Sequence, residues 1–211
     1  MNLKYFRYNE AGDFHSQKCV EKLNEIAKFL KDKYKIKTYG YTARKDLDFS
    51  NVYFKVKNSN RGTNGNNGRV IVISKIEDLP KRCYLCPGDC GKCLVCLTKR
   101  KVAFLEHGRN KNAKYRHKVK HNSKYIKHNG LELSIGNSKL DNTFMILNMG
   151  DAMSCPSAKL NFCDQTNICY ARQAEKQYKA VLAYRQRQKK YWLSHSSNRI
   201  IDDFNFVLKG G

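Results

Sequence analysis

The order strand, helix, strand at the start of the chain constrains its fold more than any other feature of the sequence. The run Leu3 to Tyr8 is β-prone, and Gly12 and Asp13 interrupt it. Ser16 can then cap a helix, and a second strand is predicted from Ile36 to Tyr41. One face of this helix carries Cys19, Val20, Leu23, Ile26, Ala27 and Leu30. Two strands joined by a helix within about 40 residues predict an α/β fold, either a partial (βα) barrel or an open parallel sheet.

Further elements are predicted on both sides of a cysteine-rich centre. Strands are expected around residues 52–56, from Val70 to Ile73, at 133–135 and from Phe144 to Leu147. A long helix is expected from about Cys169 to Leu193, and a short one around Asp203 to Leu208. The long helix would turn inward Ala171, Ala174, Tyr178, Val181, Leu182 and Trp192. We therefore divide the chain into an α/β half (1–80), a small cysteine-rich metal module (81–97), a basic linker or arm (98–130) and a second α/β half (131–211).

The charge of the chain favours a polyanionic partner. Its 211 residues include 41 Lys and Arg against 18 Asp and Glu, a formal charge of +23. Such a field attracts nucleic acid, although a lysine-rich composition alone, or a solvated connector, would look the same. The segment 98–130 holds the densest basic run. The residues expected to contact nucleic acid are Lys99, Arg100, Lys101, Arg109, Lys114, Arg116, Lys118 and Lys120.

The sequence also predicts where the chain resides. No run reaches the roughly 18 to 20 apolar residues that cross a bilayer, and the start MNLKYFRYNE lacks an apolar export segment. Nine cysteines without such a segment favour a reducing compartment, where clustered thiols bind metal more often than they form disulfides. We expect a cytoplasmic protein that does not associate with a membrane.

The first candidate metal site is the run CYLCPGDCGKCLVC. Its cysteines, separated by two, three, two and two residues, are Cys83, Cys86, Cys90, Cys93 and Cys96. Each Cys-x-x-Cys turn can clamp a metal, and Pro87, Gly88 and Gly91 permit tight bends. Structural zinc and an iron–sulfur cluster both fit this spacing. One thiol of the five exceeds the needs of a four-ligand site.

The second candidate metal site is Cys155, Cys163 and Cys169, between a strand end and a helix start. Three thiolates that hold a four-iron cluster leave one iron with an open coordination position. A catalytic cluster needs such a position to bind its substrate or cofactor. The alternative is a pair of buried thiols and one unrelated cysteine. Cys19, on an apolar helix face, is expected in the core.

Acidic and polar residues follow the predicted strands. Glu10 and Asp13, with His15, could bind a divalent metal, hold an amine or form a capped turn. Arg44 follows the next strand. The carboxyl ends of parallel strands converge, so we assign Glu10, Asp13 and Arg44 to catalysis. The expected cofactor-binding residues are Gly12, Tyr41, Thr42 and Asn148.

Several of these segments together resemble the phage gene-product-88 family. The matching segments are Gly136-Asn137-Ser138-Lys139-Leu140, Cys155-Pro156-Ser157-Ala158, Cys163, Cys169-Tyr170-Ala171, Ala11-Gly12-Asp13-Phe14 and Tyr39-Gly40-Tyr41-Thr42. In that family the cysteine segment precedes the GDF segment, whereas here it follows, so the chain looks like a circular permutant of the family. The resemblance implies a host bacterium that carries phage or prophage.

In the family's order the elements are also similar to the first half of a radical S-adenosylmethionine barrel. That similarity implies a 4Fe-4S cluster on Cys155, Cys163 and Cys169 whose fourth iron binds S-adenosylmethionine. It further implies that Glu10 and Asp13 receive the amine of that cofactor and that Arg44 or Lys45 receives a carboxylate or phosphate.

Three functions remain open from the sequence. The leading hypothesis is a phage-type iron–sulfur protein with radical-enzyme-like chemistry, acting on or near nucleic acid. The second is a non-catalytic, zinc-dependent nucleic-acid-binding protein in which both cysteine sets are structural. The third is a metal-dependent nuclease that uses Glu10, Asp13 and His15.

Overall fold

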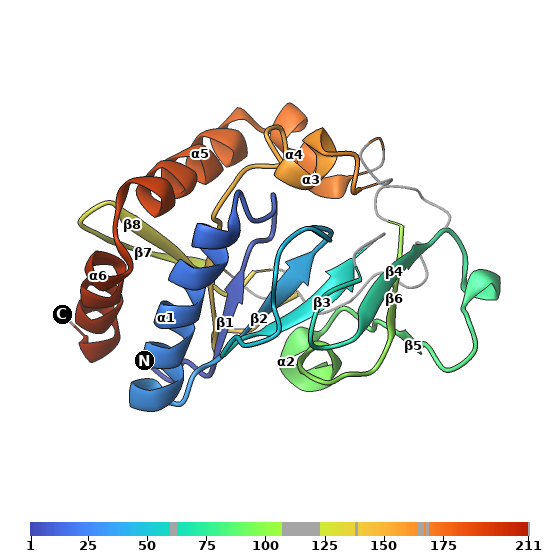
Figure 1. The fold of residues 1–211 in the computed structure, drawn as a ribbon, viewed down its shortest axis with the longest axis horizontal. Helices are drawn as coiled ribbons and strands as arrows, with labels where there is room; N and C mark the ends of the chain where they lie inside the picture. The colour runs from blue at the N-terminus through green and yellow to red at the C-terminus, as the bar shows by residue number, and fades with distance from the viewer. Residues whose placement is uncertain (60–62, 107–122, 138, 164–166, 168, 211) are drawn as a thin grey trace.

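The protein is seen here as a computed structural model, which describes residues 1–59, 63–106, 123–137, 139–163, 167 and 169–210. Its described strands form one nine-stranded sheet in the order β5-β6-β4-β3-β2-β1-β9-β8-β7 (Figure 1). The strands are β1 Tyr5–Tyr8, β2 Lys37–Thr42, β3 Lys55–Ser59, β4 Arg69–Ile73, β5 Tyr84–Leu85, β6 Val102–Leu105, β7 Lys124–His128, β8 Leu131–Ile135 and β9 Phe144–Leu147. The helices are α1 Gln17–Tyr34, α2 Cys90–Cys93, α3 Pro156–Lys159, α4 Tyr170–Gln177, α5 Lys179–Ser194 and α6 Ser197–Lys209.

Most of this sheet is parallel. Strands β1 to β6 and β9 run in one direction, and β8 and β7 continue the sheet antiparallel beyond β9. The predicted α/β class with a parallel sheet is therefore confirmed. The sheet has two edge strands, β5 and β7, among the residues described.

Helix α1 forms as its apolar spacing predicts. It begins after Ser16 and ends at Tyr34. The next residue, Lys35, has a φ of 57° in the left-handed region, and its amide donates to the carbonyl oxygens of Leu30 and Lys31. The helix buries Cys19, Val20, Leu23, Ile26, Ala27 and Leu30, the six residues predicted for its core face. This burial anchors the helix on the sheet and confirms that Cys19 is a core residue.

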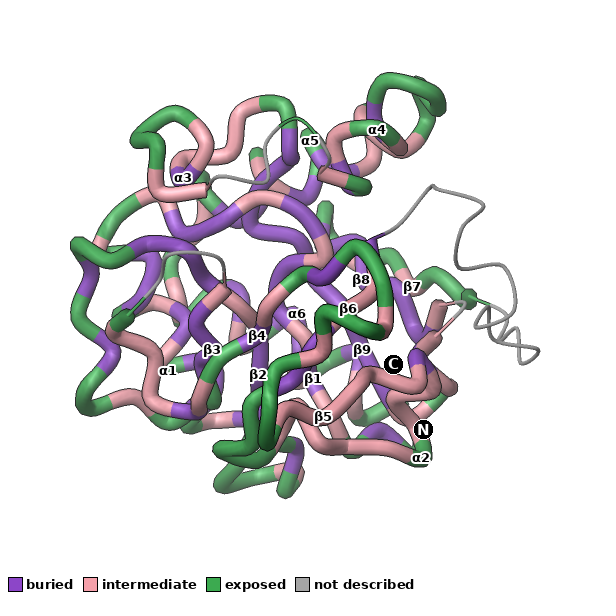
Figure 2. The backbone as a smooth tube through the Cα atoms, turned by 90° about the vertical axis from the view of Figure 1, so that its right-hand side faces the viewer, coloured by how far each residue is buried: buried purple, intermediate pink, exposed green. Residues whose placement is uncertain are grey.

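The two faces of the sheet are covered differently. Helices α1, α5 and α6 pack on one face, where Phe6, Trp192 and Phe204 are fully buried (Figures 1 and 2). The opposite face is covered in part by the cysteine-rich segment, whose Leu94 and Leu97 pack on a separate cluster of the sheet. That segment pairs with the sheet through β5, so its fold depends on the α/β body.

The predicted long helix from Cys169 to Leu193 is wrong in one respect, because it consists of two helices. Tyr178, predicted to face inward, is 54% exposed and has extended backbone between α4 and α5. No Gly or Pro marks this break. The buried side chains of α5 are Arg185, Gln188, Tyr191 and Trp192, two of which are polar. Hydrogen bonds to other segments permit their burial.

The predicted linker over 98–130 is wrong at both ends. Its residues 102–105 form β6, which lies between β4 and β5, and its residues 124–128 form the edge strand β7. Val102 and Ala103 are buried although charged residues precede them. Residues 107–122 lie outside the described part of the chain. In the described residues, no helix is both long and apolar enough to span a membrane.

Candidate functional site

A cavity of about 480 Å³ lies at the carboxyl ends of the parallel strands. The strands and the loops that follow them supply one side of the cavity, and both cysteine-containing segments supply other parts of its lining. Ligand sites of α/β proteins commonly form at this edge of the sheet. The lining residues with polar or sulfur atoms are Arg7, Asn9, Glu10, Asp13, Tyr41, Ser59, Cys86, Cys90, Glu106, Asn137, Lys139, Cys163, Cys169, Tyr170 and Arg185.

The loops after β1 and β9 are joined by Asn148. Its Oδ1 accepts hydrogen bonds from the amides of Glu10 at 2.7 Å and Ala11 at 3.2 Å. Its Nδ2 donates to Gln188 of α5 at 2.9 Å. Asn148, predicted to bind a cofactor, therefore positions the loop that carries Glu10. Glu10 itself lines the cavity, and its Oε1 accepts from Asn137.

Gly12 lets these loops approach each other. Its φ is +74°, and a Cβ at this position would lie 3.0 Å from the carbonyl carbon of Gly150. Gly12 also lines the cavity, as expected for a cofactor-binding position. These contacts bring the acidic turn after β1 and the loop after β9 together.

Asp13 is buried and joins three segments. Its Oδ1 accepts from the Phe14 amide at 2.9 Å and from Thr42 Oγ1 at 2.7 Å. Its Oδ2 accepts from the Ala43 amide at 2.8 Å and from Ser157 Oγ at 2.6 Å. Burial raises the pKa of Asp13, and the four hydrogen bonds oppose this rise. These donors occupy the four acceptor positions of the carboxylate, so Asp13 and Thr42 hold the site together.

Arg44 is also engaged inside the protein. Its guanidinium pairs with both carboxylate oxygens of Asp46 at 2.7 Å. A further nitrogen donates to the carbonyl oxygens of Phe14 at 2.5 Å and His15 at 3.2 Å. Hydrogen bonding to Asp46 raises the pKa of Arg44. Unlike Arg44, Tyr41 from the same region lines the cavity, as predicted.

The second cysteine set lies beside this cavity. Cys163 and Cys169 line it, and Cys155 is close enough to Cys163 for the two thiols to interact electrostatically. Burial raises the pKa of Cys155 to about 12, while the backbone amides of Ser157 and Ala158 favour its thiolate. Amide donors of this kind stabilise a metal-bound sulfur.

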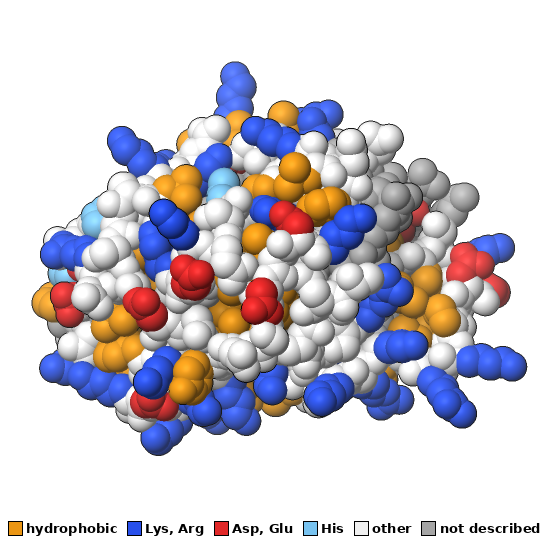
Figure 3. Space-filling model, viewed as in Figure 1, with side chains coloured by type: hydrophobic (Ala, Val, Ile, Leu, Met, Phe, Trp, Pro, Cys, Tyr) orange, Lys and Arg blue, Asp and Glu red, His pale blue; other side chains and the backbone are white. Residues whose placement is uncertain are grey.

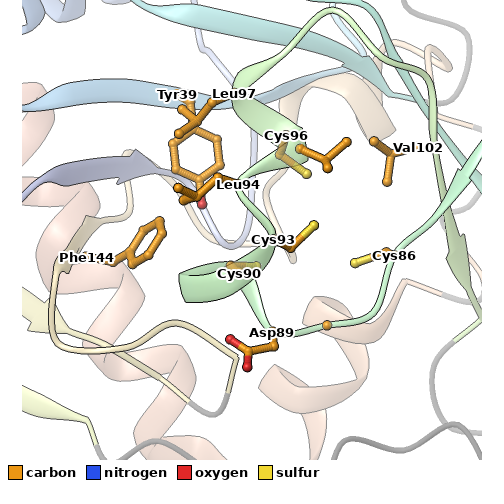
Figure 4. A pocket seen from close by; sticks show the side chains of 12 residues that line it. Tyr39, Cys86, Asp89, Cys90, Cys93, Leu94, Cys96, Leu97, Val102 and Phe144 are labelled. Carbon is orange, nitrogen blue, oxygen red and sulfur yellow. The ribbon is translucent and has the colours of Figure 1, made fainter.

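The first cysteine set surrounds a second, much smaller cavity of about 10 Å³, lined by Cys86, Cys90, Cys93 and Cys96 (Figure 4). The sulfur atoms of Cys86 and Cys93 turn toward the space between them. Burial raises the pKa of Cys86 to about 11 and that of Cys90 to about 12. Cys83 does not line this cavity.

The two cysteine sets meet at the large cavity, which sequence reasoning missed. Cys86 and Cys90 line it together with Cys163 and Cys169, although about 70 residues separate the two pairs. Across the described residues, no three His, Cys, Asp or Glu side chains are grouped to hold a metal ion in their present positions. Metal binding at either set stays a prediction, and it requires the thiols to turn toward a common point.

Three basic residues of the cavity lining were also missed, Arg7, Lys139 and Arg185. Arg7 lies between Phe6 and Tyr8, both buried on the helix-covered face, so strand alternation alone directs it to the cavity side. Lys139 belongs to a segment used above only as a family signature. Burial is the main cause that lowers the pKa of Lys139.

The predicted nucleic-acid residues are only partly described. Lys99, Arg100 and Lys101 are exposed, and the Arg100 guanidinium lies 4.8 Å from the ring centre of Tyr84. Arg109, Lys114, Arg116, Lys118 and Lys120 lie outside the described residues. Lys and Arg side chains are spread widely over the face shown in Figure 3.

No protein-family model, no curated protein and no solved structure matches this chain.

Proposed function

We propose that the protein is an iron–sulfur protein of phage type, with a four-iron cluster on Cys155, Cys163 and Cys169 and a reaction centre in the adjoining cavity. The observation that carries this proposal is the position of Cys163 and Cys169 in the lining of a cavity large enough for a small molecule. When bound through three thiolates, such a cluster supplies one-electron chemistry and an open iron position. Its action on or near nucleic acid rests on the charge of +23.

The chain's own residues fit this role. The backbone amides near Cys155 favour its thiolate form, and Cys169 begins helix α4. Tyr41, Phe104 and Tyr170 supply aromatic surface that excludes water from a bound molecule. Asp13 fixes the loops because it bonds to Ser157, which lies between Cys155 and Cys163 in the chain.

S-adenosylmethionine is not assigned contacts in this proposal. Asp13, expected to receive its amine, already accepts four hydrogen bonds. Arg44, expected to receive its carboxylate, already pairs with Asp46. Of the three predicted catalytic residues, only Glu10 combines a place in the cavity lining with acceptor positions left open.

A second candidate is a zinc-dependent nucleic-acid-binding protein. The small cavity lined by Cys86, Cys90, Cys93 and Cys96 favours it, because four thiolates around one point suit structural zinc. Exposed Lys99 to Lys101 follow this set directly and could contact phosphates. The nuclease hypothesis has no comparable support, since the carboxylate of Asp13 has no open acceptor position for a metal.

The test is metal analysis of protein purified without oxygen, combined with its visible absorption. We expect iron and sulfide, with the broad absorption of a cluster. Replacing Cys155, Cys163 and Cys169 together by serine removes the iron, while replacing the four small-cavity cysteines leaves it. Cys83→Ser is the matched control, because this thiol lines neither cavity.

The outcomes separate the candidates. Zinc alone at both sets, with no chromophore, selects the nucleic-acid-binding protein. Iron retained by the Cys155, Cys163 and Cys169 triple variant contradicts the proposed ligand assignment. Absence of every metal from protein that is folded and purified without oxygen contradicts both candidates.

A further inference from the structure

The guanidinium of Arg7 points from the centre of the sheet into the large cavity. Strand β1 pairs with β2 on one side and with β9 on the other, with Arg7 opposite Tyr39 and Ile146. The neighbours Phe6 and Tyr8 are buried in the core on the helix side. Alternation along the strand therefore places Arg7 on the cavity side, where it is part of the lining.

Arg7, which is half-buried, differs in its partners from the buried arginines Arg44 and Arg185. Arg44 pairs with Asp46, and Arg185 donates to Glu175 at 2.8 Å and to the Ala171 carbonyl at 3.2 Å. In the described part of the chain Arg7 has no ion pair or hydrogen bond, and its Nε is buried without a partner. The guanidinium carbon of Arg7 lies 5.4 Å from the centre of the Tyr41 ring, a cation–π contact.

A buried donor atom without an acceptor, such as Nε of Arg7, is costly to the folded protein. Charged arginines that have no structural partner are accordingly found where a ligand supplies the acceptors. Glu10 is a carboxylate in the electrostatic surroundings of Arg7, but among the described residues it makes no hydrogen bond or ion pair with Arg7. The donors of Arg7 therefore remain available to a molecule in the cavity.

Lys139 brings a second positive charge to the same cavity. It lines the cavity with Arg7, whose positive charge helps to lower the pKa of Lys139. Their mutual repulsion is relieved when an anion binds between them. Glu10 and Glu106 also line the cavity, and Glu10 lies within electrostatic range of both Arg7 and Lys139.

We propose that Arg7 and Lys139 form a subsite for the oxyanion, a phosphate or a carboxylate, of a small molecule whose apolar part lies against Tyr41 and Phe104. A guanidinium fork matches the two oxygens of either group. The cavity volume of about 480 Å³ falls within the common range of small-molecule sites. This inference names the ligand class of the proposed reaction centre. It shares that cavity but does not depend on which metal the thiols bind.

The test is calorimetric titration of the purified full-length protein with inorganic phosphate and, separately, with acetate at constant ionic strength. We expect saturable binding of one anion or both at a single site, and which one binds identifies the group. Arg7→Met weakens that binding by about tenfold or more, because charge-assisted hydrogen bonds are lost. Arg7→Lys keeps the positive charge but lacks the two parallel donors of the guanidinium, so it should weaken anion binding less than Arg7→Met does.

Arg82→Met is the matched control, because Arg82 is exposed and lies outside the cavity lining. It should bind the anion as the original chain does. Thermal unfolding without anion should show Arg7→Met to be at least as stable as the original chain, since a buried donor atom without a partner is removed. If Arg7→Met does not fold, Lys139→Met and Arg7→Lys carry the test.

Equal anion affinity in the original chain and in the Arg7 and Lys139 variants overturns the inference, as does a complete lack of saturable binding by the original chain. Metal content is measured on the same samples. Anion binding without iron contradicts only the iron–sulfur proposal, whereas iron without anion binding contradicts only the subsite.

Discussion

At Asp13 a single carboxylate connects the loop after β1, the end of β2 and helix α3. Sequence reasoning placed this residue at the correct edge of the sheet, since acidic residues after a strand are visible in the sequence. It could not show that every acceptor position is used by Phe14, Thr42, Ala43 and Ser157, because Ser157 lies 144 positions away. From the sequence alone, a catalytic carboxylate cannot be distinguished from a carboxylate that holds neighbouring loops together.

Replacing Asp13 by alanine should destabilise the protein by roughly 3 kcal/mol, because several buried donors lose their acceptor. Urea unfolding followed by circular dichroism measures this loss. Asp202→Ala, an exposed carboxylate on α6, is the control and should change the free energy of unfolding by less than about 0.5 kcal/mol. Equal small effects of the two substitutions would contradict the structural role of Asp13.

The pair Glu132–Arg187 predicts a pH-dependent contribution to stability. Arg187 donates to both oxygens of Glu132, at 2.6 and 3.1 Å, and lowers its pKa. A carboxylate whose pKa is lower when folded stabilises the protein above its unfolded value of about 4.3, and this stability disappears as the pH falls through the folded pKa. Arg187→Gln should therefore be less stable than the original chain at pH 7, with the difference vanishing in acid. Urea midpoints across pH test this, and a difference that grows in acid contradicts it.

At the scale of elements, hydrophobic periodicity predicted the helices and strands that have one clear apolar face or a continuous apolar run. Helix α1 was found with its six core residues, and β9 has the predicted bounds. The short strands β5, β6 and β7 were missed, because a strand of two to five residues with charged neighbours shows little alternation. The buried face of α5 was missed because it includes the polar residues Arg185 and Gln188. Their burial is stabilised by hydrogen bonds to other segments, which the sequence does not show.

The break at Tyr178 supplies a test at this scale. Tyr178 precedes α5, makes no capping hydrogen bond through its side chain and is mostly exposed. Tyr178→Asp should raise the free energy of unfolding by about 0.5 to 1 kcal/mol, because the carboxylate accepts from the first-turn amides and faces the positive end of the helix. Tyr178→Ala, which cannot cap, should give no such gain. A loss of stability in Tyr178→Asp, measured by urea unfolding, would show that the break is not a true helix start.

For the whole molecule, the order of strands in space is compatible with a chain whose two ends are joined. Starting at β9 and passing from the end of α6 to β1, successive strands β9, β1, β2, β3 and β4 are neighbours in the sheet. The two chain ends lie near each other in both views (Figures 1 and 2). Phe204 of α6 and Phe6 of β1 are in ring contact at 5.3 Å, so the joined order would bury the same core.

A chain with Gly211 linked to Met1 by a short flexible segment and reopened between β6 and β7 should therefore fold. We expect the same circular dichroism spectrum and an unfolding midpoint close to that of the original chain, because the packed contacts are unchanged. A version reopened inside α1, which interrupts a buried core helix, is the control and should not fold. Failure of the first version alone would contradict this account of the chain's order.

The central claim, that a cluster on Cys155, Cys163 and Cys169 faces the cavity, is tested most directly by anomalous X-ray scattering at the iron edge. Crystals of protein prepared without oxygen should show one compact iron peak within bonding distance of all three sulfurs and open to the cavity that Arg7 lines. An iron peak centred on Cys86, Cys90, Cys93 and Cys96 instead, or well-ordered Cys155, Cys163 and Cys169 without any metal peak, would contradict the claim.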